Sequence, residues 1–236
     1  VFIMARTAVP IRSPEDPNQL LDIMPGALFD ITKRLEGVSP LMFHRRILFG
    51  GEQPAPMFAD GLPPLGLTDQ MKMTIKPAAE VTPQEIADTD GVIGVVAGGE
   101  ARAYPVKMAN IHDVINDTLG GKPIAVTWSF LANAALAMER SLPDDKTVVF
   151  GSAGLLYQGV ILCYDAGSAS LWSPLTRAAV AGEMTGARLT PVRTWFTPWQ
   201  AWKTRHPDTT ALVGIEPPLG DYTHNPAQPM TGYMQN

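Results

Sequence analysis

The residues best placed for chemistry lie around His112 in the stretch NIHDVIND. Asp113 follows the histidine directly, and Asn116 and Asp117 come shortly after. An imidazole titrates near neutral pH, and a carboxylate that orients it can make it a general base or a metal ligand. We expect residues 107–115 to form one short helix that presents these groups together. His112 is thus the candidate catalytic residue, and the simpler alternative is a buried histidine that holds this helix against a sheet.

A second group lies in the stretch EARAYP, where Arg102 and Tyr104 are two residues apart. At that spacing both side chains point to one face of a strand, and Glu100 can join them. Such a face suits an anion or a polar ligand, although an arginine paired on a half-exposed strand is the simpler interpretation. Trp172 either fills the core or walls a pocket. The candidate ligand-binding residues are Arg102, Tyr104, His112 and Trp172.

Other reactive residue types give no clear site. Ser152 lies in GSAGLL, which lacks the G-x-S-x-G pattern of a nucleophile elbow, and we do not expect it to be a nucleophile. Cys163 is the single cysteine and lies in an apolar run, so it is expected to be a buried, inert thiol. Metal-ligand spacing is absent among the histidines, and we expect no metal and no cofactor. The four histidines are His44, His112, His206 and His224.

Composition indicates one compact, mainly β protein. The chain has 236 residues, a net charge of −5 and no run of Lys or Arg, which argues against a nucleic-acid partner. Its 22 prolines and 21 glycines are spread along the chain and favour short strands with irregular connections. We predict a β-sandwich or a closed barrel of about eight short strands with a few short helices, with an α+β fold as the alternative.

The strands that carry the candidate residues can be located from local patterns. VIGVV and RAYPV flank AGGEA, and the pair Gly98 and Gly99 supplies the positive backbone angles that a tight hairpin turn needs. Glu139 and Arg140 are expected to be solvated charges at a hairpin. Helices are predicted at residues 82–87 and 198–205. Further strands are predicted at IAVTWSF, NAALAMER, TVVFGS, LLYQGVILCYD, SLWSPLT and RLTPVRT.

The two ends of the chain read differently from its centre. We divide the chain into an N-terminal helical extension, residues 1–48, a β-rich domain, residues 49–213, and an irregular tail, residues 214–236. The extension should form two short amphipathic helices that begin near Asn18 and meet at Pro25. The opening VFIMA is too short to span a bilayer, although it can be the remnant of a signal or anchor. Membrane contact through this segment is the lesser alternative to packing.

Several stretches resemble the bacterial domain of unknown function 3179 family. GVVAGGEARAYP, NIHDVINDTLGG and VTWSFLANAA match its opening, centre and following strand, and the resemblance runs from about Gly50 to Leu212. Where relatives carry Cys-Pro-Leu-Cys, this chain has Ser129, Phe130, Leu131 and Ala132. Thiol redox chemistry or thiolate metal binding at this place is therefore excluded. We expect Ser129 and Ala132 to lie close to His112, at the family's shared site.

The resemblance brings no established activity, but it implies an extracytoplasmic location, because relatives commonly look exported. Two functions from different classes remain. The first is a non-catalytic accessory or scaffold subunit of a larger, membrane-associated assembly, with protein subunits as partners that contact the two ends of the chain. The second is an enzyme or a protein that binds a small ligand or a metal in a pocket around His112, Arg102 and Tyr104. We favour the first, in which the chain is not an enzyme.

Overall fold

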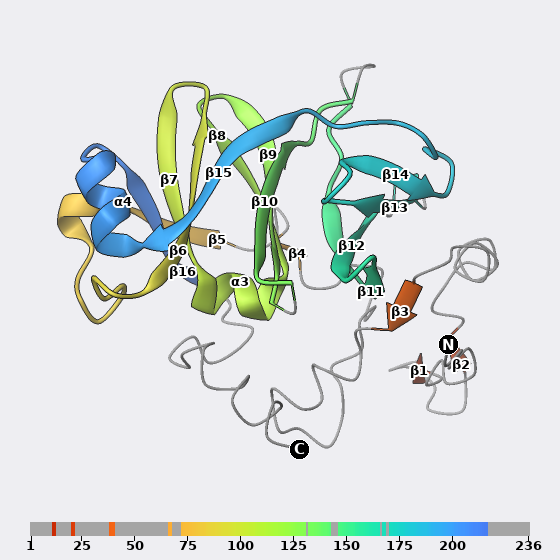
Figure 1. Ribbon diagram of the computed structural model, residues 1–236, viewed down its shortest axis with the longest axis horizontal. Coiled ribbons are helices and arrows are strands. Elements are labelled where there is room, and N and C mark those ends of the chain that lie inside the picture. The colour runs from red at the N-terminus through yellow and green to blue at the C-terminus, as the bar shows by residue number, and fades with distance from the viewer. Residues whose placement is uncertain are drawn as a thin grey trace.

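Figure 1 shows the computed structural model, in which strands dominate and helices are few and short. The structure describes residues 72–130, 132–142, 146–165, 167–168 and 170–216, together with four short strands nearer the N-terminus. Within these residues the helices are α3 (Val106–His112) and α4 (Trp199–Arg205), and one 3-10 turn, η2, spans Ala78–Glu80. The prediction of a mainly β fold with a few short helices is confirmed.

Most of the described strands belong to two sheets. The larger sheet curls on itself like a half-barrel, and the smaller one lies beside it (Figure 1). The larger has nine strands in the order β4-β8-β9-β10-β15-β6-β7-β16-β5, which span, in that order, Gly66–Leu67, Val114–Leu119, Lys122–Ser129, Ala134–Glu139, Pro191–Pro198, Gly91–Ala97, Glu100–Pro105, Thr210–Glu216 and Lys72–Pro77. The smaller has five in the order β14 (Ala178–Ala181), β13 (Ser170–Ser173), β12 (Val160–Asp165), β11 (Phe150–Tyr157) and β3 (Val38–Pro40).

Two tight hairpins bring the candidate residues into the larger sheet. Gly98 and Gly99 turn β6 into β7 with φ of 56° and 86°, and Gly120 and Gly121 turn β8 into β9 with φ of 55° and 73°. These positive angles are those of turns that match the twist of the flanking strands. The two tips touch, since a Cβ on Gly98 would lie 2.0 Å from the carbonyl oxygen of Gly120. The predicted hairpin is confirmed, and its tip is held against a second hairpin.

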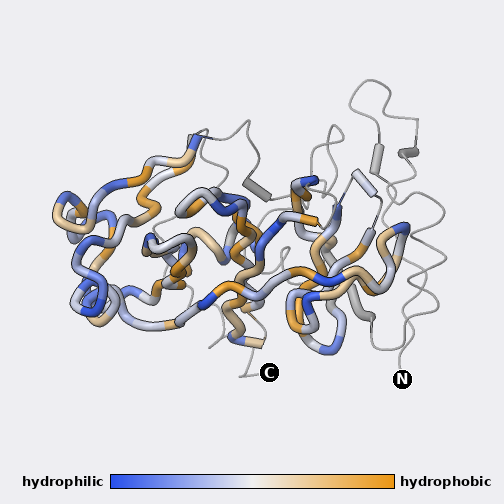
Figure 2. Tube along the Cα trace, turned by 90° about the horizontal axis from the view of Figure 1, so that it is seen from above, coloured by the Kyte–Doolittle hydropathy of each residue, from blue (hydrophilic) through white to orange (hydrophobic). Residues whose placement is uncertain are grey.

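The curl creates two cores on opposite faces of β8. Ile115 belongs to the core inside the curled sheet, together with Tyr104, whereas Val114 belongs to the core between the two sheets, together with Phe150. Because side chains alternate along a strand, β8 serves both cores. Figure 2 shows hydrophobic stretches along the strands and hydrophilic residues around α4. Because β8 has a core on each face, its polar residues Asn116 and Asp117 must also point into one core or the other.

The helix α4 packs on the outer face of the curled sheet. Trp199 and Trp202 are buried there against Val92 and Ala103. The helix predicted for residues 198–205 is confirmed, and it begins one residue later, after Pro198. Trp202 also donates a hydrogen bond from Nε1 to Thr209 Oγ1 at 2.9 Å. This bond fixes the ring over the sheet.

The packing of Trp202 predicts a large effect of a small substitution. A Cβ on Gly94 would lie 2.3 Å from Cε3 of the Trp202 ring, and a ring fixed by a hydrogen bond cannot easily move away. We expect Gly94→Ala to destabilise the protein by about 1–3 kcal/mol, the usual cost of overpacking. Gly214→Ala is the control, because its Cβ would meet Thr74 at an ordinary 3.5 Å. Urea unfolding midpoints that are equal for the two variants would contradict this packing.

Several local predictions need correction. The helix expected over residues 107–115 ends at His112, because Asp113 adopts φ of 56° and the β-branched Val114 and Ile115 pair with β9 as a strand. Residues 82–87 form turns rather than a helix. The strands β5, β14 and β16 were not predicted, and β16 continues to Glu216, beyond the expected start of the tail.

The N-terminal extension falls largely outside the described residues. Within the predicted helical stretch, Leu20–Leu21 is extended and pairs with Ile11–Arg12 as a two-stranded ladder, so the helix prediction is wrong at these two residues. Val38–Pro40, also in the extension, adds an antiparallel strand to β11. In the ranges that the structure describes, no helix is long and apolar enough to cross a membrane.

A surface carboxylate near η2 gives a prediction about acid. Glu85 accepts hydrogen bonds from Lys76 Nζ at 2.6 Å and from the Thr82 backbone N–H at 2.9 Å, which lower its pKa from 4.5 to about 2. A depressed pKa contributes stability above the unfolded-state pKa, and that stability is lost as pH falls toward the folded-state value. Wild-type protein should therefore lose stability relative to Glu85→Gln between pH 4.5 and about 2.

The effect should be small, because water screens this partly exposed carboxylate. Thermal unfolding of both proteins across this pH range provides the measurement. Two parallel stability curves would show that the Glu85 contacts do not stabilise the folded state.

Candidate functional site

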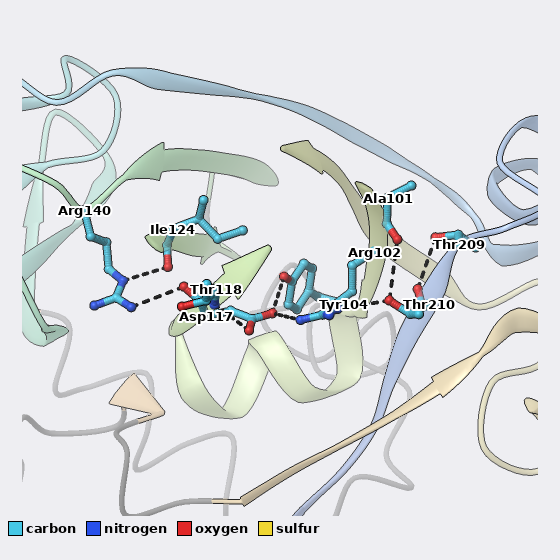
Figure 3. Close-up of polar contacts among 9 residues, drawn as sticks. All are labelled: Ala101, Arg102, Tyr104, Asp117, Thr118, Ile124, Arg140, Thr209 and Thr210. Carbon is cyan, nitrogen blue, oxygen red and sulfur yellow. Dashed lines mark hydrogen bonds and ion pairs between the residues drawn. The ribbon is translucent and has the colours of Figure 1, made fainter. Parts of the chain in front are cut away.

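The most concentrated polar cluster is built around Asp117 on β8. Its Oδ2 accepts hydrogen bonds from the Tyr104 hydroxyl at 2.6 Å and from Arg102 Nη1 at 2.5 Å (Figure 3). Its Oδ1 accepts the Thr118 backbone N–H at 2.6 Å. Arg102 Nε donates in turn to Thr210 Oγ1 on β16 at 3.0 Å. The cluster thus joins β8 to β7 and β16, two strands that do not pair with β8 through the backbone.

Burial and charge set the protonation of this cluster. Burial raises the pKa of Tyr104 well above its ordinary value, and the negative charge of Asp117 raises it further. Burial alone would lower the pKa of Arg102, but Asp117 and Tyr104 outweigh it and the net shift is upward. Tyr104 therefore stays a neutral donor and Arg102 a cation. Both groups are suited to hold Asp117 in place, and the phenol is far from the ionised form that a general base would require.

Asn116, the neighbour of Asp117, reaches the opposite core. Its Nδ2 donates to the Phe150 carbonyl at 2.7 Å, and its Oδ1 accepts the Phe150 N–H at 3.0 Å. This reciprocal pair imitates a backbone ladder and joins β8 to β11 of the smaller sheet. The family-like stretch NDT therefore ties two separate interfaces together from one strand.

Arg140 is also internal, which corrects its expected role. It is 7% exposed and donates from Nε to the Ile124 carbonyl at 2.8 Å, from Nη1 to Val148 O at 2.6 Å and from Nη2 to Asp117 O at 3.2 Å. Arg140 is therefore a buried hydrogen-bond donor and not a solvated charge at a hairpin. Carbonyls that are buried away from water need such donors. Glu139 does lie at the surface, where it accepts a bond from Lys122 Nζ at 2.5 Å.

His112 lies apart from the Asp117 cluster. It is the last residue of α3 and is fully buried. The strand β8 begins at Val114, two residues after His112. A strand rises about 3.3 Å per residue, so Asp117 lies roughly 10 Å farther along β8 than Val114. Trp172 lies on β13, with its ring edge-on to Phe150 at a centroid distance of 5.7 Å. The structure brings Arg102 and Tyr104 together at Asp117, whereas His112 ends α3 and Trp172 belongs to the core between the two sheets.

Ser129 and Ala132 stand where the resemblance puts two cysteines. Trp128 N–H donates to Asp113 O at 2.8 Å and extends the β8–β9 ladder, so Ser129 lies at the end of the ladder where His112 and Asp113 lie. Ser129 is buried, and its Oγ accepts the Ile161 N–H at 3.3 Å. Ala132 is exposed in the turn after it. The structure therefore places Ser129, the first position where the resemblance puts a cysteine, at the end of the β8–β9 ladder that follows α3.

Cys163 is buried as expected, on β12. Burial raises the pKa of its thiol, and Asp113 raises it further, so the thiol stays protonated. In the part of the chain that the structure describes, no three His, Cys, Asp or Glu side chains form a group that could hold a metal.

These features define a class of protein: a two-sheet, mainly β fold whose motif residues tie its strands together from the inside. The family described as "Protein of unknown function (DUF3179)" matches residues 59–236, and the chain belongs to this family. The match includes the C-terminal residues that the sequence analysis assigned to a separate tail. No curated protein and no solved structure matches the chain.

Proposed function

We propose that the chain is a non-catalytic accessory or scaffold subunit of a larger extracytoplasmic, membrane-associated assembly. The main support for the proposal is that the motif residues bind one another inside the fold. Asp117 accepts three hydrogen bonds from Tyr104, Arg102 and Thr118, and these contacts hold the fold together. Residues that fasten strands are not available to bind a substrate.

Burial supports the same conclusion. A general acid or base must reach the proton that it transfers. Tyr104 is fully buried, and Asp117 is 7% exposed. The replacement of the family cysteines by Ser129 and Ala132 removes two further reactive groups. The alternative pocket needs His112 beside Arg102 and Tyr104. These two residues instead bind Asp117, which lies farther along β8 than the end next to His112, and this arrangement supports the accessory role.

The partner and the location rest on sequence. Family resemblance supports an extracytoplasmic place. The apolar residues of the N-terminal extension, among them Met24, Leu28 and Ile31, support docking onto protein or membrane. The tail carries Tyr222, Met230, Tyr233 and Met234 without a regular period. Such a segment gains order by burying these side chains on a partner, because a few apolar groups alone do not offset an ordering cost of about 1–2 kcal/mol per residue. These four tail residues and most of the extension lie outside the described residues.

The test asks whether a partner protein co-purifies with the chain and which residues that association needs. The tagged full chain is expressed in its native host and isolated from solubilised membranes, beside a Tyr222→Ser/Tyr233→Ser variant and a His112→Gln variant. We expect a partner in fixed stoichiometry with the wild type, loss of that partner with the tail variant at unchanged melting temperature, and retention of the partner by folded His112→Gln. A wild-type chain that stays alone, or a partner that ignores the tail, would argue against the subunit role.

A further inference from the structure

We propose that one buried water molecule lies between the two sheets, beside a row of three polar side chains, and accepts a hydrogen bond from Trp172 Nε1. The polar row consists of Ser152, Cys163 and Trp172, which pair directly across β11, β12 and β13. Directly paired residues of antiparallel strands point to the same face of a sheet. Cys163 and Trp172 belong to the core that faces the larger sheet, so the row faces that way.

Trp172 carries a buried indole N–H. The side chain is fully buried, and no atom of the described residues accepts a hydrogen bond from Nε1. Buried polar groups in proteins are nearly always paired, either with protein or with an ordered water. Two other tryptophans follow this rule within the protein, because Trp128 donates to Asn110 Oδ1 at 3.2 Å and Trp202 donates to Thr209 Oγ1 at 2.9 Å. Trp172 is the exception among these three.

The polar groups of the row suit a bound water. A buried water needs two to four polar partners, and the row offers the Ser152 hydroxyl and the Cys163 thiol beside the indole N–H. Asp113 acts electrostatically on Cys163, so a carboxylate is close to the row. An anion is disfavoured beside this carboxylate, and a cation is disfavoured by the indole donor. The species that fits is a neutral acceptor such as water.

A high-resolution crystal structure of the full chain tests the proposal, with Trp172→Phe as the variant. We expect a solvent peak about 2.7–3.2 Å from Trp172 Nε1, in contact with a second polar group of the row, and a weakened or absent peak in the variant. The Trp128 indole is the internal control and should show no such peak. A protein acceptor at Nε1, or no density there, would overturn the proposal. If the variant does not fold, the wild-type map alone decides.

Discussion

Replacing Asp117 with alanine should be the most damaging single substitution at the polar cluster. The change removes the common acceptor of Tyr104 and Arg102 and leaves a largely buried guanidinium without its carboxylate. Breaking a buried ion pair by removing one partner costs about 3–5 kcal/mol. We expect a loss of that size in the free energy of unfolding, measured by urea titration.

Two variants separate this effect from a general loss of charge. Asp208→Ala also removes one negative charge, but Asp208 is exposed, and its loss should change stability by no more than about 0.5 kcal/mol. Asp117→Asn keeps an oxygen that can still accept from Tyr104, so it should fall between the wild type and Asp117→Ala. If Asp117→Ala is no worse than Asp208→Ala, the cluster does not stabilise the fold.

Replacing Arg140 with methionine should have the second largest effect. Methionine keeps an unbranched stem, but the carbonyls of Ile124, Val148 and Asp117 each lose a donor. An orphaned buried acceptor costs about 1–3 kcal/mol, and neighbouring losses do not simply add. We expect a destabilisation of about 3 kcal/mol in total, measured as a shift in the urea midpoint at unchanged slope.

Arg205→Met is the matched control for Arg140. Arg205 is an exposed residue of α4, where its guanidinium lies 5.9 Å from the centroid of the Trp195 ring. An exposed cation–π contact contributes about 0.5–1 kcal/mol, so this loss should be much smaller. Equal losses in the two variants would mean that the three carbonyl bonds of Arg140 contribute no more than a surface contact.

The hairpin of β6 and β7 could be predicted from the sequence because its signal is local. The pair Gly98 and Gly99 sits between two apolar runs, and only a turn with positive φ at both positions fits that pattern. The extent of α3 could not be found in the same way. Apolar residues at 114 and 115 suit either a helix or a strand, and pairing with β9, a tertiary contact, decides for the strand.

The candidate site was found only in part. The spacing of Arg102 and Tyr104 placed both on one face of β7, where they do meet a common partner. That partner, Asp117, was assigned to the His112 group because it is near in sequence. If residues 114–119 are read as a strand, the neighbours Asn116 and Asp117 point to opposite faces. That alternation was the available sequence signal.

Arg140 shows a limit of a different kind. A charged residue at the end of a strand is usually solvated, and nothing local distinguishes it from Glu139. Its burial depends on carbonyls of two neighbouring strands and of the segment before β11, so only the assembled fold identifies its role.

The most direct test of the central claim, that motif residues fasten β7 to β8, is a double-mutant cycle between Tyr104→Phe and Asp117→Ala. Urea unfolding of the wild type, both single variants and the double variant gives the coupling. The hydroxyl of Tyr104 donates to Asp117 at 2.6 Å, so Tyr104→Phe should cost about 1–2 kcal/mol in the wild type and almost nothing once Asp117 is alanine. The same cost in both backgrounds would contradict the account.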